Sequence, residues 1–102
     1  MTLALVVRFD LPDPEAAQRF DTLLGAALPA VAAEPGTQLY LPHTSATEPL
    51  VRLVYAVYSD HAAHERHNTA PAMARFLREL PELAAVVRVE ELVPTPDVSP
   101  RP

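Results

Sequence analysis

Three histidines at a spacing of three residues, His61, His64 and His67, follow a strongly apolar segment of this sequence. An imidazole changes protonation near neutral pH, so it can act as a general base or as a metal ligand. On a helix, residues three apart lie close together, so two of these rings could share an ion. A further ligand would have to be His43 or Glu65, and no pattern places either one. We therefore favour a solvated helix face over a metal site.

Tyr40, Tyr55 and Tyr58 are the aromatic residues whose hydroxyls could hold a phenolic ligand in a cavity. Buried tyrosines with a solvated hydroxyl are also ordinary packing, so this interpretation stays open. Tyr55 and Tyr58 are three positions apart on one predicted strand, so their side chains point to opposite faces of a sheet. We expect Tyr55 to share the helix-covered side with His67, and Tyr58 to meet a partner subunit.

The composition excludes several classes of chemistry. The chain has no Cys and no Lys, which excludes thiolate nucleophiles, sulfur-bound metals and Schiff-base chemistry. Its two glycines, Gly25 and Gly36, cannot form a phosphate-binding loop. The net charge is −5 without a basic patch, which argues against nucleic-acid binding. His, Tyr, Arg and carboxylates remain, so we expect no cofactor and no resident metal.

The length of 102 residues suffices for one domain. No apolar run approaches the roughly 20 residues that span a bilayer, and the N-terminus lacks the pattern of a signal peptide. We therefore expect a cytoplasmic protein without a membrane segment. The domain is expected over residues 1–93. The tail, residues 94–102, contains four prolines; we expect it to be disordered or, alternatively, laid along a partner subunit.

Hydrophobic periodicity and turn residues predict seven elements. In chain order these are a strand over 3–9, a helix from Pro14 to the Glu34-Pro35-Gly36 turn with a kink at Pro29, a strand over 37–43, a strand over 50–58, a helix over 61–67, a helix with Pro71 in its first turn that stops at Pro81, and a strand over 86–93. Asp13 and Asp60 are the expected helix caps.

Counted with the two consecutive helices around Pro71 as one unit, this order is βαββαβ. It is typical of a ferredoxin-like α+β fold with a four-stranded antiparallel sheet and its helices on one side. The uncovered face is expected to carry Val6, Val54, Ala56 and Tyr58, which is too apolar to meet water. A second copy is the simplest cover, so we predict a homodimer that forms a dimeric α+β barrel. Arg8 is expected to pair with Glu90 or Glu91 on a neighbouring strand.

Four stretches of the chain carry a resemblance to a known family. They are the first strand ending at Arg8-Phe9, then Ala33-Glu34-Pro35-Gly36-Thr37 with Leu39-Tyr40, then Tyr55-Ala56-Val57-Tyr58-Ser59-Asp60, and finally Glu65-Arg66-His67 through Pro71 to Phe76-Leu77. Together they resemble the antibiotic biosynthesis monooxygenase (ABM) family over about residues 2–93. Tyr58 stands where that family usually has Trp, and Ala72 stands where a second His is frequent.

The resemblance implies oxygenation of a small aromatic or quinol-like substrate without flavin, haem or metal. It favours His67 as the general base, because His67 matches the helix histidine of the family. The haem-degrading members have different residues at the positions of Val7, His67 and Leu77, so we expect no haem. We therefore favour an oxidoreductase of the ABM monooxygenase type. The alternatives are a non-catalytic ligand-binding or interaction protein on the same dimeric barrel, and an isomerase or decarboxylase that uses His67 as base.

Overall fold

The computed structural model describes residues 2–93, so the predicted Pro-rich tail over 94–102 lies outside the described residues. Residues 2–93 form seven elements in the predicted order. They are β1 (Leu3–Asp10), α1 (Pro14–Ala32), β2 (Thr37–Thr44), β3 (Val51–Tyr58), α2 (His61–Thr69), α3 (Pro71–Leu83) and β4 (Val86–Leu92).

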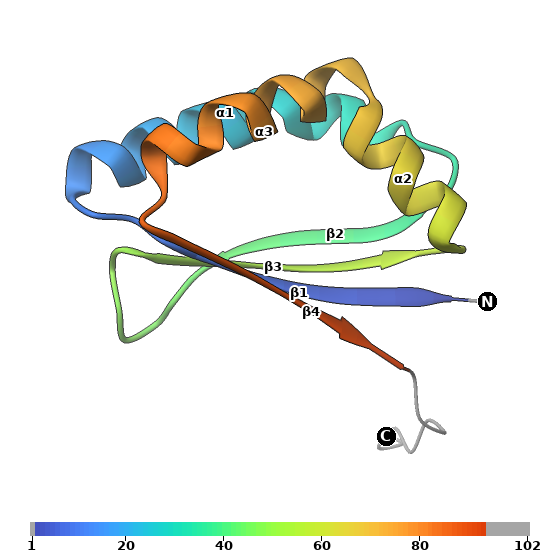
Figure 1. The fold of residues 1–102 in the computed structure, drawn as a ribbon, viewed down its shortest axis with the longest axis horizontal. Coiled ribbons are helices and arrows are strands. Elements are labelled where there is room, and N and C mark those ends of the chain that lie inside the picture. The colour runs from blue at the N-terminus through green and yellow to red at the C-terminus, as the bar shows by residue number, and fades with distance from the viewer. Residues whose placement is uncertain (1, 94–102) are drawn as a thin grey trace, which may run out of the picture.

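The four strands form one sheet in the order β2-β3-β1-β4, and every neighbouring pair is antiparallel. All three helices lie in a layer over one face of this sheet, with α1 and α3 side by side (Figure 1). The predicted ferredoxin-like α+β fold is therefore confirmed. Its consequence for the site is that each strand has one side facing the helices and one side facing away from them.

Three phenylalanines form the centre of the core between the two layers. Phe9 comes from β1, Phe20 from α1 and Phe76 from α3, and each is at most 4% exposed. Their ring centroids lie 4.9 Å apart for Phe9 and Phe20, and 5.4 Å apart for Phe20 and Phe76. Tilted and edge-to-face rings at such distances attract each other beyond their burial of apolar area. This cluster fixes α1 and α3 on the sheet.

Aspartates start two of the helices as predicted. The Asp13 carboxylate accepts a hydrogen bond of 2.8 Å from the Ala16 amide, and the Asp60 carboxylate accepts one of 2.8 Å from the Ala63 amide. Each cap satisfies an amide that has no partner within the first helical turn. The cap at Asp60 fixes the start of α2, the helix that carries the three histidines.

The predicted end of α3 at Pro81 is wrong, because the helix continues through this residue to Leu83. A proline inside a helix removes one hydrogen bond and crowds the preceding turn. Here it lies in the last turn, and the buried side chains of Leu80 and Leu83 hold that turn on the core. Pro29 likewise does not end α1, which continues to Ala32.

The two faces of β3 are the reverse of the expectation. Val54, Ala56 and Tyr58 are at most 2% exposed and belong to the core under the helices, whereas Tyr55 is 37% exposed on the open face. Val6, opposite Tyr55 in the sheet, lies on the open face as expected. Because β3 is apolar on both sides, its sequence carries no alternation that could have settled which side meets the helices.

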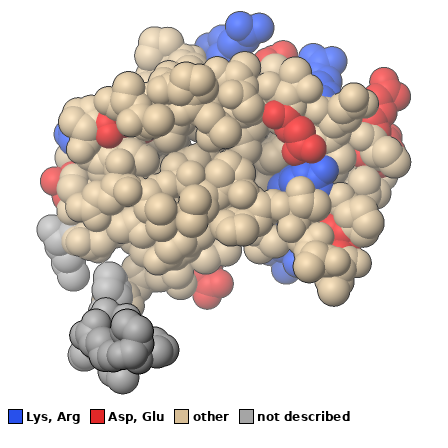
Figure 2. Space-filling view, turned by 180° about the vertical axis from the view of Figure 1, so that it is seen from behind, with Lys and Arg blue, Asp and Glu red and all other residues tan. Residues whose placement is uncertain are grey.

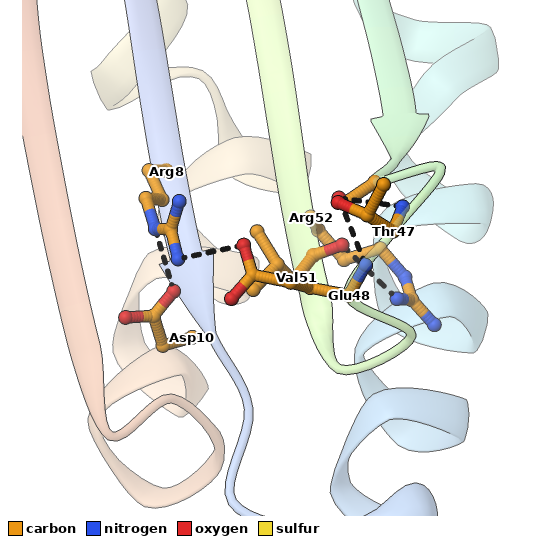
Figure 3. Close-up of polar contacts among 7 residues, drawn as sticks. Arg8, Asp10, Thr47, Glu48, Val51 and Arg52 are labelled. Carbon is orange, nitrogen blue, oxygen red and sulfur yellow. Dashed lines mark hydrogen bonds and ion pairs between the residues drawn. The ribbon is translucent and has the colours of Figure 1, made fainter.

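The expected partners of Arg8 are also wrong. Its guanidinium donates hydrogen bonds of 2.8 Å to Asp10 and 3.4 Å to Glu48, the latter from the loop between β2 and β3 (Figure 3). In the sheet Arg8 lies opposite Arg88, so Glu90 is displaced by two positions along β4 and Glu91 points to the other face.

One area of the surface lacks charged side chains. Neither the edge strand β2 nor residues 23–32 of α1 include Asp, Glu, Lys or Arg. Seen from behind, the surface has a broad area without charged side chains (Figure 2). Charged side chains commonly protect an exposed sheet edge, and this edge lacks them. Among the described residues, no helix has the length and hydropathy needed to cross a bilayer.

Candidate functional site

A cavity of about 200 Å³ lies between the sheet and helices α2 and α3. Ten of its lining side chains are apolar. The polar ones are Tyr40, Tyr58, His64, His67 and Asn68. A larger hollow of about 320 Å³ between α1 and α3 has neither His nor Tyr in its wall. An apolar cavity with a few convergent polar groups is typical of a small-molecule site, so we take the first as the candidate site.

His67 is the central polar residue of this cavity, and its side chain is held by a carboxylate. It is only 3% exposed, and its Nδ1 lies 2.7 Å from Oε1 of Glu34. Thr37 Oγ1 donates a hydrogen bond of 2.7 Å to the same oxygen. A carboxylate beside Nδ1 favours the tautomer with the proton on Nδ1 and the lone pair on Nε2. Among residues 2–93, Nε2 takes part in no hydrogen bond.

The contact between Glu34 and His67 depends on a close approach at Gly36. Ser59 donates a hydrogen bond of 2.9 Å from its amide to the Gly36 carbonyl, which ties the start of β2 to the end of β3. A Cβ atom at Gly36 would clash with the Cβ atom of Ala63 in α2. The glycine therefore lets the turn that carries Glu34 pack directly against α2.

Replacing Gly36 with Ala is expected to lower the free energy of unfolding by about 1–3 kcal/mol, because the added methyl group must push the turn away from α2. Urea unfolding followed by circular dichroism measures this change. Gly25→Ala is the matched control, since a Cβ atom there meets nothing within 4 Å. In the helix α1 the control is expected to raise stability by about 0.5–1 kcal/mol. Equal effects of the two substitutions would contradict this role of Gly36.

Two of the three predicted tyrosines lie against His67. The ring centroids of Tyr40 and Tyr58 are each 5.2 Å from that of His67. Burial and the charge of Glu34 raise the pKa of Tyr40 to about 12. Burial, with Tyr40 and Glu34 nearby, also raises the pKa of Tyr58. Both hydroxyls therefore stay protonated at neutral pH and are able to donate hydrogen bonds.

Tyr55 does not line the cavity, contrary to the expectation that it would share the helix-covered side with His67. It faces away from the helices, and Tyr58, expected at a partner subunit, takes the place beside His67. This follows from the reversed faces of β3, since side chains two apart on a strand share one side.

The three histidines of α2 lie in three different environments. His61 is exposed, His64 is half-buried and His67 is buried. Burial and the neighbouring His67 lower the pKa of His64, which favours the neutral form of its ring. The Nε2 atom of His64 lies 3.3 Å from the side-chain nitrogen Nδ2 of Asn68, and its ring centroid lies 4.9 Å from that of Tyr58. His64 and Asn68 therefore form a second polar group on the cavity wall.

Comparison with known proteins agrees with this architecture. The family described as antibiotic biosynthesis monooxygenase matches residues 2–79. A comparison with curated proteins gives no match. The fold is similar to that of Rv0793 from Mycobacterium tuberculosis, with a TM-score of 0.87 and 26% identity over 97% of this chain and 100% of that one.

Two further solved structures have the same fold. One is PA3566 from Pseudomonas aeruginosa, with a TM-score of 0.85 and 24% identity over 93% of this chain and 95% of that one. The other is a protein described as an antibiotic biosynthesis monooxygenase, with a TM-score of 0.84 and 17% identity over 92% of this chain and 99% of that one. At these identities the likeness concerns the fold.

Proposed function

The chain belongs to the antibiotic biosynthesis monooxygenase family, and on this premise we propose that it is a cofactor-independent monooxygenase of a small aromatic, quinol-like substrate. The observation that carries the proposal is the buried His67 in the wall of a mostly apolar cavity of about 200 Å³, with its Nδ1 held 2.7 Å from Oε1 of the half-buried Glu34. Such a pair supplies a base at the place where a phenol would be dry and confined.

In the proposed reaction, Nε2 of His67 takes the proton of a substrate hydroxyl group. Glu34 holds the ring through Nδ1 and stabilises the positive charge that the imidazole then carries. A phenolate in an apolar cavity is costly unless it is hydrogen-bonded. Tyr40 and Tyr58, whose hydroxyls stay protonated, are the donors that we assign to its oxygen.

The electrons for the oxygenation come from the substrate itself. The phenolate has raised electron density on its ring carbons, one of which forms a bond to dioxygen. Cleavage of the O–O bond leaves one oxygen atom on the ring and releases the other as water, with the proton on His67 returned to it. For a hydroquinone, one substrate and one O₂ give one hydroxybenzoquinone and one water. No external reductant is consumed, so the proposed reaction needs no redox cofactor. This agrees with a sequence in which we find no cofactor-binding motif.

Oxygen uptake with a panel of substituted hydroquinones and anthrones tests this function. The expected result is enzyme-dependent uptake of one O₂ per substrate, with one ¹⁸O atom incorporated from ¹⁸O₂. The product should be the hydroxybenzoquinone from a hydroquinone and the anthraquinone from an anthrone. Binding of the same compounds without uptake would contradict the proposal and identify a ligand-binding protein. An enzyme-catalysed rearrangement of these compounds, or loss of CO₂ from carboxylated analogues of them, would instead support the use of His67 as base in an isomerase or decarboxylase.

We also propose that two copies pack their open sheet faces together. On this face Leu41 is 44% exposed, and Tyr55, which lies opposite Leu41, is 37% exposed. The half-buried side chains around Tyr55 are Val6 on β1 and Leu53 and Val57 along β3. A contiguous apolar patch of this kind marks an interaction surface in a soluble protein. The uncharged edge strand β2, which carries Leu41, borders this face. A second copy with the same face would cover it, as in the dimeric α+β barrel expected from the sequence.

Substituting Tyr55 with Asp is expected to convert the dimer to a monomer, because a carboxylate would be buried in the interface without a partner. Sedimentation velocity should give the wild type twice the 11.1 kDa of one chain, and the variant about that of one chain. Gln18→Asp is the matched control, since it adds the same charge on the exposed side of α1 and should leave the dimer intact. A monomeric wild type would overturn the proposal.

A further inference from the structure

We infer that the ligand of this cavity is an uncharged phenol or hydroquinone with an alkyl chain, whose ring lies at His67 and whose chain leaves over β4. The position of the ring rests on the proposed function. The position of the chain rests on how polar and apolar side chains are distributed along the cavity.

The side chains that line the cavity from the sheet are polar toward one edge of the sheet and aliphatic at the other. Tyr40 and Tyr58, on β2 and β3, form the polar end with His67. Val87 and Val89 line the same cavity from β4, at the opposite edge of the sheet. Neighbouring strands lie about 4.8 Å apart, so the three spacings between β2 and β4 give a floor of roughly 14 Å. A single ring at His67 therefore occupies only one end of this floor.

The aliphatic end opens to the surface. Val87 is 43% exposed, Val89 is 60% exposed and Leu77 of α3 is 38% exposed, although all three line the cavity. They therefore form its mouth. An apolar ligand group that covers solvent-exposed apolar side chains removes both surfaces from water, and this favours binding. The mouth is thus built to bind an alkyl group that continues from the ring.

The volume and the charges limit the ligand further. An apolar cavity of about 150 Å³ holds one benzene molecule, so about 200 Å³ accepts one ring and the first part of an alkyl chain, but not a second fused ring. Within residues 2–93, no Arg, Asp or Glu side chain lines the cavity, so a ligand carboxylate would have no counterion among them. Glu91 lies on the helix-facing side of β4, opposite Leu5, and its charge disfavours an anionic chain end.

The test is calorimetric binding, without oxygen, of methyl-, propyl- and pentylhydroquinone to the wild type and two variants. In the wild type the Kd is expected to fall about threefold to fourfold for each added methylene, as burial of a CH₂ group requires. In Val87→Ser/Val89→Ser this dependence on chain length should be lost, while the Kd of methylhydroquinone changes less than twofold. Val93→Ser is the control, since Val93 is 78% exposed on the chain beyond the cavity wall, and it should behave as the wild type.

Affinity independent of chain length, or tighter binding of a fused naphthohydroquinone than of pentylhydroquinone, would overturn the inference. A steep dependence on chain length in a protein that consumes no oxygen would support the inference and refute only the proposed function. Oxygen uptake with equal affinity for all three compounds would refute only the inference.

Discussion

Replacing His67 with Gln is expected to lower kcat for oxygen uptake by about 10²–10⁴-fold, the usual loss when a general base is removed. Glutamine keeps the approximate size of the ring and can still hydrogen-bond Glu34, but it cannot take up the proton of a phenol. The loss should fall on kcat more than on KM, since the cavity that binds the ring is otherwise unchanged. Stopped-flow oxygen uptake with a hydroquinone measures both constants.

Two further variants separate the base from its surroundings. Glu34→Ala removes the carboxylate that holds Nδ1 at 2.7 Å, so Glu34 acts as a positioning residue whose loss lowers kcat and shifts its pH profile. Tyr55→Phe is the control, because Tyr55 lies on the open face away from the cavity. If His67→Gln keeps wild-type kcat while folded, the catalytic role of His67 is refuted.

The largest loss of stability is expected for Phe20→Ala, at about 3–5 kcal/mol in the free energy of unfolding. Phe20 is 1% exposed and its ring packs against those of Phe9 and Phe76, so truncation leaves a cavity where three elements meet. Small domains are stable by only about 5–15 kcal/mol, so this variant should be close to unfolding. Urea unfolding followed by circular dichroism gives the value.

The control for this prediction is Val93→Ala, which removes apolar atoms from a side chain that is 78% exposed. Its effect should stay within about 0.5 kcal/mol. A loss below about 1 kcal/mol for Phe20→Ala would mean that the three rings do not form the centre of the core. Because Phe20 lies outside the candidate site, the comparison also separates folding from catalysis.

The fold could be predicted because its signals are local. Asp13 and Asp60 mark helix starts through caps that act within four residues, and the structure shows both caps. The order of strands and helices then admits few topologies. In contrast, Pro81 was expected to end α3, and the buried side chain of Leu83 beyond it outweighs the proline.

The interior of the site could not be predicted to the same degree. Glu34 is 33 positions from His67 in the sequence, and its place in a Glu-Pro-Gly turn indicates only the end of a helix. The assignment of Tyr55 to the cavity failed because β3 is apolar on both sides, and Tyr58 lies there instead. Both cases depend on how layers pack, which is not encoded in the spacing of residues along one segment.

The most direct test of the account is the absorbance spectrum of 4-nitrophenol bound to the protein at a pH at which the free compound is protonated. If His67 receives the proton of a bound phenol, the wild type should show the phenolate band and His67→Gln should bind the compound without it. If both proteins bind the protonated form, His67 does not act as a base in this cavity.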